Sequence, residues 1–369
     1  MTTLTRAAVL SSIGGRFEIE ELELAPPRAG EVQVKLEACG VCASDDHLVS
    51  GATEHPLPVV PGHEGAGRVE ALGAGVTGLA LGDRVILSWA PSCAGCPQCD
   101  AGRPARCTRH VKAIWSGELP GGGTRFSRKS GQPVAHFSAL GAFSERIVVA
   151  EDCCIKSDPA VPATIAALIG CAVTTGVGAA LNTAPVRPGQ SVLVYGVGGV
   201  GLSVVMGARL AGAARIVVVD LSEEKCAAAK ALGATVALVK PSVAELRAAF
   251  EGAPIETVFD TTGVEALQQE AIRVASPGGT VVLVGLSDKH SGPKIPAARL
   301  IRTEKTVTGC FYGSAAPARE FPRLEGLYRA GRLPLDELVT RTYRLDEINE
   351  GFEALRSGAV GRGVVLFDP

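Results

Sequence analysis

The sequence has little of what marks a membrane or nucleic-acid-binding protein. Its 369 residues carry a net charge of -2 with no run of lysine or arginine, which argues against nucleic acid and membranes as partners. The most apolar stretches, such as IVVVD and TVVLVGL, have the length of a strand and fall far short of a membrane span. No charged start followed by a long apolar segment opens the sequence, so we expect no secretory signal and a cytoplasmic protein.

Cysteine and glycine, by contrast, are plentiful, with 11 cysteines and 45 glycines. Disulfides are rare in a reducing cytoplasm, so clustered cysteines there indicate metal binding. The glycines suit tight turns and close approaches of the backbone. The chain is too long for one ordinary core, which predicts two domains.

Two patterns of secondary structure divide the chain. Up to about residue 170, short strands such as EVQVKLEACG, GDRVILSWA and SERIVVA are broken by turns. From about Val173, buried strands alternate with helices, which predicts an α/β domain with a parallel sheet covered on both faces. Mixed short elements return near residue 308. We therefore expect a mainly β domain at 1–172 and 308–369 and a doubly wound domain at 173–307, with 116–133 as a long functional or mobile loop.

Four cysteines in CAGCPQCDAGRPARC have the spacing of a metal site. One loop can wrap a tetrahedral ion with four thiolates, the closed shell that zinc prefers in structural sites. An iron–sulfur cluster is the alternative, although the spacing differs from the ferredoxin patterns. The segment 90–110 is thus expected to be a zinc lobe with the ligands Cys93, Cys96, Cys99 and Cys107.

The segment VLVYGVGGVGLSVVMGARLAGAARIVVVD joins a strand, a glycine turn, a helix and a second strand ending in Asp220. In dinucleotide-binding Rossmann folds the first glycine permits the turn, the second lets the pyrophosphate approach, and the third lets helix and strand pack closely. Gly196, Gly198 and Gly201 fit these roles, and the helix N-terminus offers N–H donors to phosphate. Asp220 would bind the ribose hydroxyls and repel a 2′-phosphate, which favours NAD over NADP. The structural alternative is a plain glycine turn.

A histidine between glycines, in GHEGAG, raises the question of a second metal site. A catalytic zinc needs about three protein ligands and one open position. Cys42 and His63 could supply two ligands, and Cys171 lies where the nucleotide domain is expected to begin. Spacing alone does not join these residues: His63 could be a hydrogen-bonded turn residue and Cys171 a small buried thiol.

With GVCASD, GHEGAG, the four-cysteine lobe, GCAVTTG, GVGGVG and the Asp220 strand end in this order, the chain resembles the zinc-dependent alcohol dehydrogenases of the medium-chain dehydrogenase/reductase superfamily. The resemblance covers essentially the whole chain. It implies a GroES-like catalytic domain beside a Rossmann domain, with one structural and one catalytic zinc per chain. It also implies that Cys42, His63 and Cys171 bind the catalytic zinc.

The resemblance implies roles for four further residues near that zinc. Glu64 is an acid that can approach the metal during ligand exchange, and Asp45 orients the ligand histidine. Ser44 accepts the proton of the substrate hydroxyl, and His47 passes it to solvent. Lys225 matches a lysine that contacts the adenosine ribose, and Arg362 matches an arginine that contacts the pyrophosphate. The cofactor-binding set is then Gly196, Gly198, Gly199, Val200, Gly201, Asp220, Lys225, Val284 and Arg362.

These roles imply a zinc-dependent oxidoreductase that transfers a hydride between a primary alcohol or aldehyde and NAD. Trp89 and Phe137 match positions that line the substrate pocket, which points to aryl or long-chain alcohols if Trp89 is not an ordinary core aromatic. Relatives often carry a second pyrophosphate cation where this chain has Ala43. Thr53 stands where glutathione-linked enzymes tend to have an acid. Some similar relatives hold their cofactor tightly and pass electrons to an external acceptor.

Two other functions stay open from the sequence. One is a formaldehyde dehydrogenase that needs glutathione or mycothiol, and the other is a non-catalytic nucleotide-binding protein. The resemblance implies a homodimer or homotetramer, paired through strands near TVVLVGL and ARLIRTE. The remaining residues of metal-binding type are expected to be packed thiols, Cys39, Cys153, Cys154, Cys226 and Cys310, and surface or loop histidines, His55, His110, His136 and His290.

Overall fold

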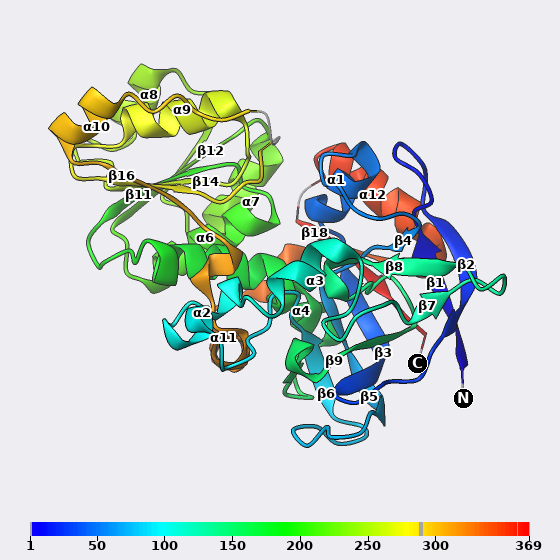
Figure 1. The fold of residues 1–369 in the computed structure, drawn as a ribbon. Coiled ribbons are helices and arrows are strands. Elements are labelled where there is room, and N and C mark those ends of the chain that lie inside the picture. Colours follow the sequence, from blue (N-terminus) through cyan, green and yellow to red (C-terminus); the bar gives the residue numbers. More distant parts are fainter. Residues whose placement is uncertain (1, 288–290, 360, 369) are drawn as a thin grey trace. The chain divides into compact units, whose positions relative to one another are not determined.

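The structure, a computed structural model, describes residues 2–287, 291–359 and 361–368 (Figure 1). It divides into two units, 1–171 with 316–369, and 172–315. The sequence-based boundaries were 172/173 and 307/308. His290, which we expected on the surface or in a loop, lies outside the described residues.

Two sheets form the first unit. The five-stranded sheet has the order β1 (Thr3–Val9), β2 (Glu18–Leu24), β7 (Phe126–Ser127), β8 (Pro133–His136) and β4 (Val59–Val60). The larger sheet runs β10 (Cys154–Lys156), β6 (Arg84–Leu87), β5 (Gly65–Leu72), β3 (Glu31–Gly40), β18 (Arg362–Leu366) and β17 (Val339–Arg344), with β9 (Arg146–Ala150) also paired to β3. The C-terminal strand β18 lies antiparallel to β3, with Val364 opposite Gly40. This pairing brings the first residues of β18 beside those that follow β3, where the Val41 N–H donates to the Gly363 carbonyl.

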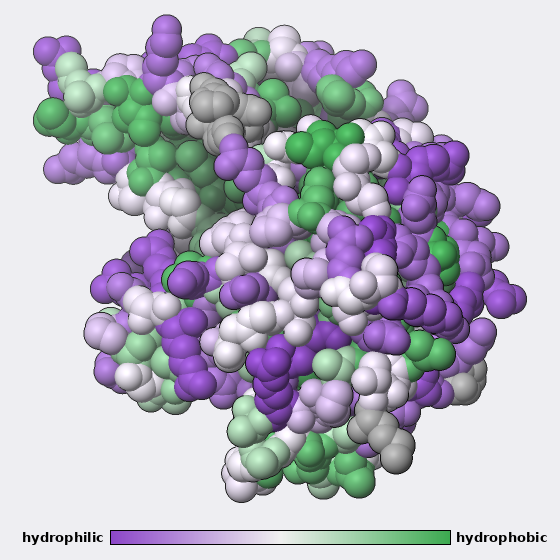
Figure 2. All heavy atoms as spheres, turned by 45° about the vertical axis from the view of Figure 1, so that its right-hand side comes forward, coloured by the Kyte–Doolittle hydropathy of each residue, from purple (hydrophilic) through white to green (hydrophobic). Residues whose placement is uncertain are grey.

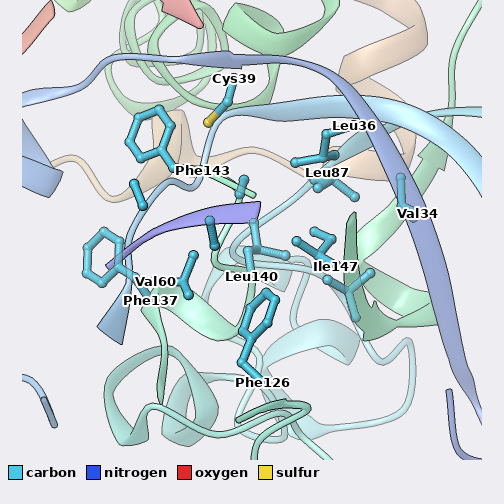
Figure 3. Packing of buried hydrophobic residues seen from close by; sticks show 14 of the residues in the cluster. Val34, Leu36, Cys39, Val60, Leu87, Phe126, Phe137, Leu140, Phe143 and Ile147 are labelled. Atoms are coloured by element: carbon cyan, nitrogen blue, oxygen red, sulfur yellow. The ribbon is translucent and has the colours of Figure 1, made fainter. Parts of the chain in front are cut away.

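Apolar side chains of these strands form one buried core (Figure 3). Figure 3 shows Phe126, Phe143 and Leu140 among aliphatic side chains, with the sulfur of Cys39 in the same cluster and Phe137 at its side. Burial of this apolar surface is the main force that stabilises the unit. On the face drawn in Figure 2, hydrophilic residues are spread over the surface with smaller hydrophobic groups between them.

Short helices complete the first unit. They are α1 (Ala43–Ser50), α2 (Pro97–Asp100), α3 (Val111–Ser116), α4 (Ala163–Leu168), α11 (Pro317–Arg329) and α12 (Ile348–Arg356). Helix α4 continues through a π-helical turn, Ile169–Val173, then α5 (Thr174–Gly178) and a second π-helical turn, Ala179–Thr183. Residues 163–183 are therefore one helix long and apolar enough to cross a bilayer, and 83% of its most apolar window is buried inside the protein. The sequence analysis missed this helix, because threonines and glycines interrupt the apolar run.

The second unit holds a six-stranded sheet whose neighbouring strands are all parallel. Helices α6 (Gly199–Leu210) and α7 (Glu223–Leu232) lie on one face, and α8 (Val243–Ala248), α9 (Glu265–Val274) and α10 (Ala297–Thr303) on the other (Figure 1). The doubly wound fold is thus confirmed. Ser222 is the N-cap of α7, and its side chain accepts from the Lys225 N–H. The strand order is β13 (Val236–Val239), β12 (Arg215–Asp220), β11 (Ser191–Tyr195), β14 (Thr257–Asp260), β15 (Thr280–Leu283) and β16 (Thr306–Gly309).

Two expectations about local structure were wrong. The segment ARLIRTE is not a strand, because residues 297–303 form α10. Residues 116–133 are not one long loop, since they include β7 and the fully buried Arg125. The strand expected in TVVLVGL is present as β15; it is paired on both sides and leaves β16 at the sheet edge.

The histidine expectations also need correction. His136 is wholly buried at the end of β8, where it accepts from the Arg125 N–H and its other ring nitrogen lies 2.9 Å from the Leu140 carbonyl. His110 does lie in a turn, as expected, but it is buried and lies 2.9 Å from Asp152. His55 does lie in a loop, where it is half-buried. Backbone groups 11 and 4 residues away satisfy the ring of His136, through a local fold that the sequence pattern did not reveal.

Candidate active site

The four lobe cysteines come together in the first unit. Their sulfur atoms all lie within 4.8 Å of one another, and Cys96 lies 3.5 Å from Cys99 and 3.9 Å from Cys107 between sulfurs. Tetrahedral zinc with bonds of about 2.3 Å places its sulfurs about 3.8 Å apart. An iron–sulfur cluster would spread the thiolates over separate irons, so this spacing fits a single ion. The four sulfur atoms of Cys93, Cys96, Cys99 and Cys107 are therefore suited to tetrahedral coordination of a structural zinc.

A second group of metal-binding side chains gathers elsewhere in the same unit. Donor atoms of Cys42, His63, Glu64 and Cys171 all lie within 4.8 Å of one another. Cys42 caps the N-terminus of α1, where the helix dipole favours a negative sulfur. Cys171 stands in the π-helical turn, an irregularity that often marks functional sites. The structure thus brings together the three sequence-predicted ligands and the carboxylate of Glu64, the acid expected near the metal.

The turn before His63 requires a glycine at position 62. Gly62 has φ +93°, and a Cβ there would lie 2.4 Å from the Phe143 nitrogen, so no other residue fits. The Gly62 N–H donates to the Asp45 carboxylate at 2.7 Å. That carboxylate also lies 3.3 Å from Nδ1 of His63, which leaves the other ring nitrogen for a metal.

Glu64 is held by the C-terminal strand. Arg362, only 5% exposed, donates from its guanidinium to Oε2 of Glu64 at 2.6 Å and to the Val41 carbonyl at 2.8 Å. The other oxygen, Oε1, has no hydrogen-bond partner among the described residues. A Cβ on Gly40 would lie 2.1 Å from Oε2, so this glycine leaves room for the ion pair. The structure therefore gives Arg362 a carboxylate partner that the sequence analysis did not foresee.

Burial and neighbouring charges shift the pKa values of this cluster. A hydrogen bond from Cys171 holds the pKa of Cys42 well below its usual range, although burial opposes this. Burial alone would lower the pKa of His63, but Asp45 and Cys42 raise it well above the ordinary value. Burial raises the pKa of Glu64 to about 7 against the attraction of Arg362. A divalent cation would take the place of protons on these donor atoms.

Helix α1 places the residues expected to move a proton. The hydroxyl oxygen of Ser44 lies 3.8 Å from the Cys42 sulfur, beside the metal-binding group. His47 is one turn further along the same helix. Its Nδ1 is buried and has no hydrogen-bond partner among the described residues, so it is available to another group.

Two aromatic rings border the cluster. Trp89 meets the His63 ring edge-on with centroids 6.4 Å apart, and Phe137 does so at 5.6 Å. Phe137 is buried (Figure 3). Trp89 is partly buried against the same core. Apolar rings at this distance exclude water from a metal site and favour an apolar or aryl ligand.

The glycine turn of the second unit has the geometry that a dinucleotide requires. Gly196 has φ +80°, and a Cβ on Gly201 would lie 2.0 Å from the Gly196 oxygen. No described atom lies within 4 Å of a Cβ placed on Gly198, so the backbone is open there. The Asp220 carboxylate accepts from the Val197 N–H at 2.8 Å, which joins the acid to the turn.

The other residues of the cofactor set have different places. Gly199 and Val200 open helix α6, and Lys225 lies in the first turn of α7. Val284 follows β15, where its N–H donates to the Asp260 carbonyl. Arg362 belongs to the other unit.

Comparison with known proteins places the chain in a family. Residues 28–162 match the alcohol dehydrogenase GroES-like domain, and residues 199–328 match the zinc-binding dehydrogenase model. An NDMA-dependent alcohol dehydrogenase of Amycolatopsis methanolica is 41% identical over 98% of both chains.

Two solved structures are similar throughout. One is an alcohol dehydrogenase zinc-binding domain protein from Burkholderia ambifaria, with 32% identity, full coverage of both chains and a TM-score of 0.94. The other is the benzyl alcohol dehydrogenase of Acinetobacter calcoaceticus, with 31% identity, coverage of 99% of this chain and 100% of that one, and a TM-score of 0.91. The chain belongs to the zinc-dependent alcohol dehydrogenases of the medium-chain dehydrogenase/reductase superfamily, enzymes that use zinc and a nicotinamide cofactor.

Proposed function

We propose that this alcohol dehydrogenase oxidises primary aryl alcohols to aldehydes with NAD, at a zinc held by Cys42, His63 and Cys171. The observation that carries the substrate class is the pair of rings, Trp89 and Phe137, set edge-on to the ligand histidine. The name of the benzyl alcohol dehydrogenase relative supports the same class.

Each residue around the zinc site has a separate role in the proposed reaction. When bound, the zinc polarises the substrate oxygen and the dinucleotide takes the hydride. Ser44 accepts the hydroxyl proton at its Oγ, and His47 carries the proton away through an imidazole that can both take up and release it. Asp45 keeps the His63 ring in place. Glu64, tethered by Arg362, stays beside the site without being one of the three assigned ligands.

The preference for NAD rests on Asp220. Its carboxylate is bonded to the N–H groups of Val197, Leu221 and Ser222. It is thereby held at the end of β12, where it would accept from ribose hydroxyls and repel a phosphate. The implied cofactor contacts of Lys225, Val284 and Arg362 are part of the same proposal.

We also propose a cytoplasmic homo-oligomer. All eleven cysteines are free thiols, as thiolate metal sites require, which suits a reducing compartment. Strand β16 is an edge of the parallel sheet, and an exposed edge can pair with that of a second copy. Sedimentation analysis would distinguish a monomer from a dimer or tetramer.

A substrate panel tests the function. Benzyl alcohol should be turned over more efficiently than ethanol, and NAD should be preferred to NADP. Reduction of NDMA without added NAD would show that the dinucleotide remains bound during turnover. Activity confined to formaldehyde with added glutathione or mycothiol would refute the aryl alcohol assignment and support the thiol-dependent reaction.

A further inference from the structure

His55 has no assigned role, yet its side chain lies at the aromatic wall of the site. Its ring meets the Phe137 ring edge-on, with centroids 5.5 Å apart. Phe137 in turn meets His63 at 5.6 Å. Two ring contacts therefore connect a metal-ligand candidate to His55, and all three residues belong to the same unit.

Only one of the two ring nitrogens of His55 has a hydrogen-bond partner among the described residues. Nδ1 lies 3.1 Å from the Pro56 carbonyl oxygen, which can only accept, so the proton sits on Nδ1. Burial lowers the pKa of His55, which favours the neutral ring. Nε2 is then an acceptor. It is buried, and no described residue donates to it.

A buried acceptor without a donor is costly, because it has lost its hydrogen bond to water. The cost is recovered when a ligand supplies an N–H or O–H group. None of the described residues supplies such a donor to Nε2.

Two ring contacts separate His55 from the candidate metal ligand, 5.6 Å from His63 to Phe137 and 5.5 Å from Phe137 to His55 between centroids. A benzylic alcohol whose oxygen lay beside His63 would place its ring among these aromatic side chains, at the distance that aromatic rings prefer.

We propose that Nε2 of His55 accepts a hydrogen bond from a phenolic hydroxyl on the ring of the substrate, so that hydroxybenzyl alcohols are favoured over benzyl alcohols without a ring hydroxyl. This inference rests on the proposed aryl alcohol function and narrows its substrate class. His55 is a specificity residue in this account and takes no part in the hydride or proton transfer.

The experiment compares kcat/KM for 3- and 4-hydroxybenzyl alcohol with the corresponding methylbenzyl alcohols. In the wild type at least one hydroxyl isomer should exceed its methyl counterpart by about fivefold, the worth of one ordinary hydrogen bond. His55→Phe keeps a ring against Phe137 but removes the acceptor, and should abolish the preference. His55→Gln restores an oxygen acceptor and should keep most of it.

The two variants and the substrate ratios separate the possible failures. The ratio within each enzyme cancels any general loss of activity, and comparison of that ratio between the wild type and the variants cancels the electronic effect of the substituent. A ratio that His55→Phe leaves unchanged, or a wild type with no preference for either hydroxyl isomer, overturns the role of His55 while the aryl alcohol function stands. A wild type inactive on benzyl alcohol and on every ring-substituted analogue overturns both.

Discussion

Replacing Arg125 by methionine should lower the melting temperature of the protein by roughly 6 to 20 °C. The guanidinium is 1% exposed and its partner Glu31 is 6% exposed. Arg125 donates from Nε to the Glu31 carboxylate at 2.8 Å and from a second nitrogen to the other carboxylate oxygen. It also donates to the carbonyls of Gly122 and Thr124, which fixes the turn before β7.

The magnitude follows from what the substitution leaves behind. Removing one partner of a buried ion pair leaves the other charge buried without a partner, which lowers the free energy of unfolding by about 3–5 kcal/mol. In a unit of this size each kcal/mol lowers the melting temperature by about 2–4 °C. The double variant Glu31→Leu, Arg125→Met removes both charges and should recover most of the lost stability. The part that is not recovered is the hydrogen bond that Glu31 accepts from the Arg28 N–H.

Arg128 provides a matched control on the same segment. It makes a two-pronged ion pair with Glu20, at 2.6 and 2.7 Å, but the two side chains are 28% and 21% exposed. Solvent screening reduces such a pair to about 0–1 kcal/mol. Differential scanning fluorimetry of both methionine variants gives the comparison. A loss for Arg125→Met no larger than for Arg128→Met would refute the reasoning.

Three further predictions concern the cofactor turn and a buried histidine. Asp220→Ala should raise the NADP-to-NAD ratio of kcat/KM by about tenfold or more, since it removes one like charge near the phosphate; an unchanged ratio would remove Asp220 from the specificity argument. Gly201→Ala forces a Cβ against the Gly196 oxygen and should weaken NADH binding in calorimetry, whereas Gly326→Ala, with open space around it, should not. Burial lowers the pKa of His136 to about 4, below its unfolded value, so the unfolded chain takes up the proton first. Stability is then complete above about pH 6.5 and falls by up to about 3 kcal/mol as the pH drops to 4; an NMR titration of the ring with a pKa of 6 or above would contradict this.

Local sequence signals predicted much of the second unit. The turn that needs φ > 0 at Gly196, the buried strands around it and the Ser222 N-cap are each encoded within a few neighbouring residues. The strand that the resemblance implied near ARLIRTE is absent, because residues 297–303 form the short helix α10, none of whose residues is buried.

The candidate zinc site depended on contacts that no local pattern contains. Cys42 and Cys171 are far apart in sequence and come together in one cluster, so the family resemblance, and not the spacing, connected them. The ion pair of Glu64 with Arg362 joins the turn before β5 to the first residue of β18, 298 positions away in the sequence. Burial of His136 and Arg125 likewise depends on partners that the folded chain brings together, the Arg125 N–H for His136 and the Glu31 carboxylate for Arg125.

The central claim is that Cys171 binds a catalytic zinc distinct from the one held by the lobe cysteines. Metal analysis of the purified protein with parallel assays of benzyl alcohol oxidation tests it most directly. We expect two zinc ions per chain in the wild type and in Cys153→Ser, a control at another buried cysteine outside both clusters. Cys171→Ser should keep one zinc and lose turnover with an unchanged circular dichroism spectrum. Two zinc ions and retained turnover in Cys171→Ser would contradict the account.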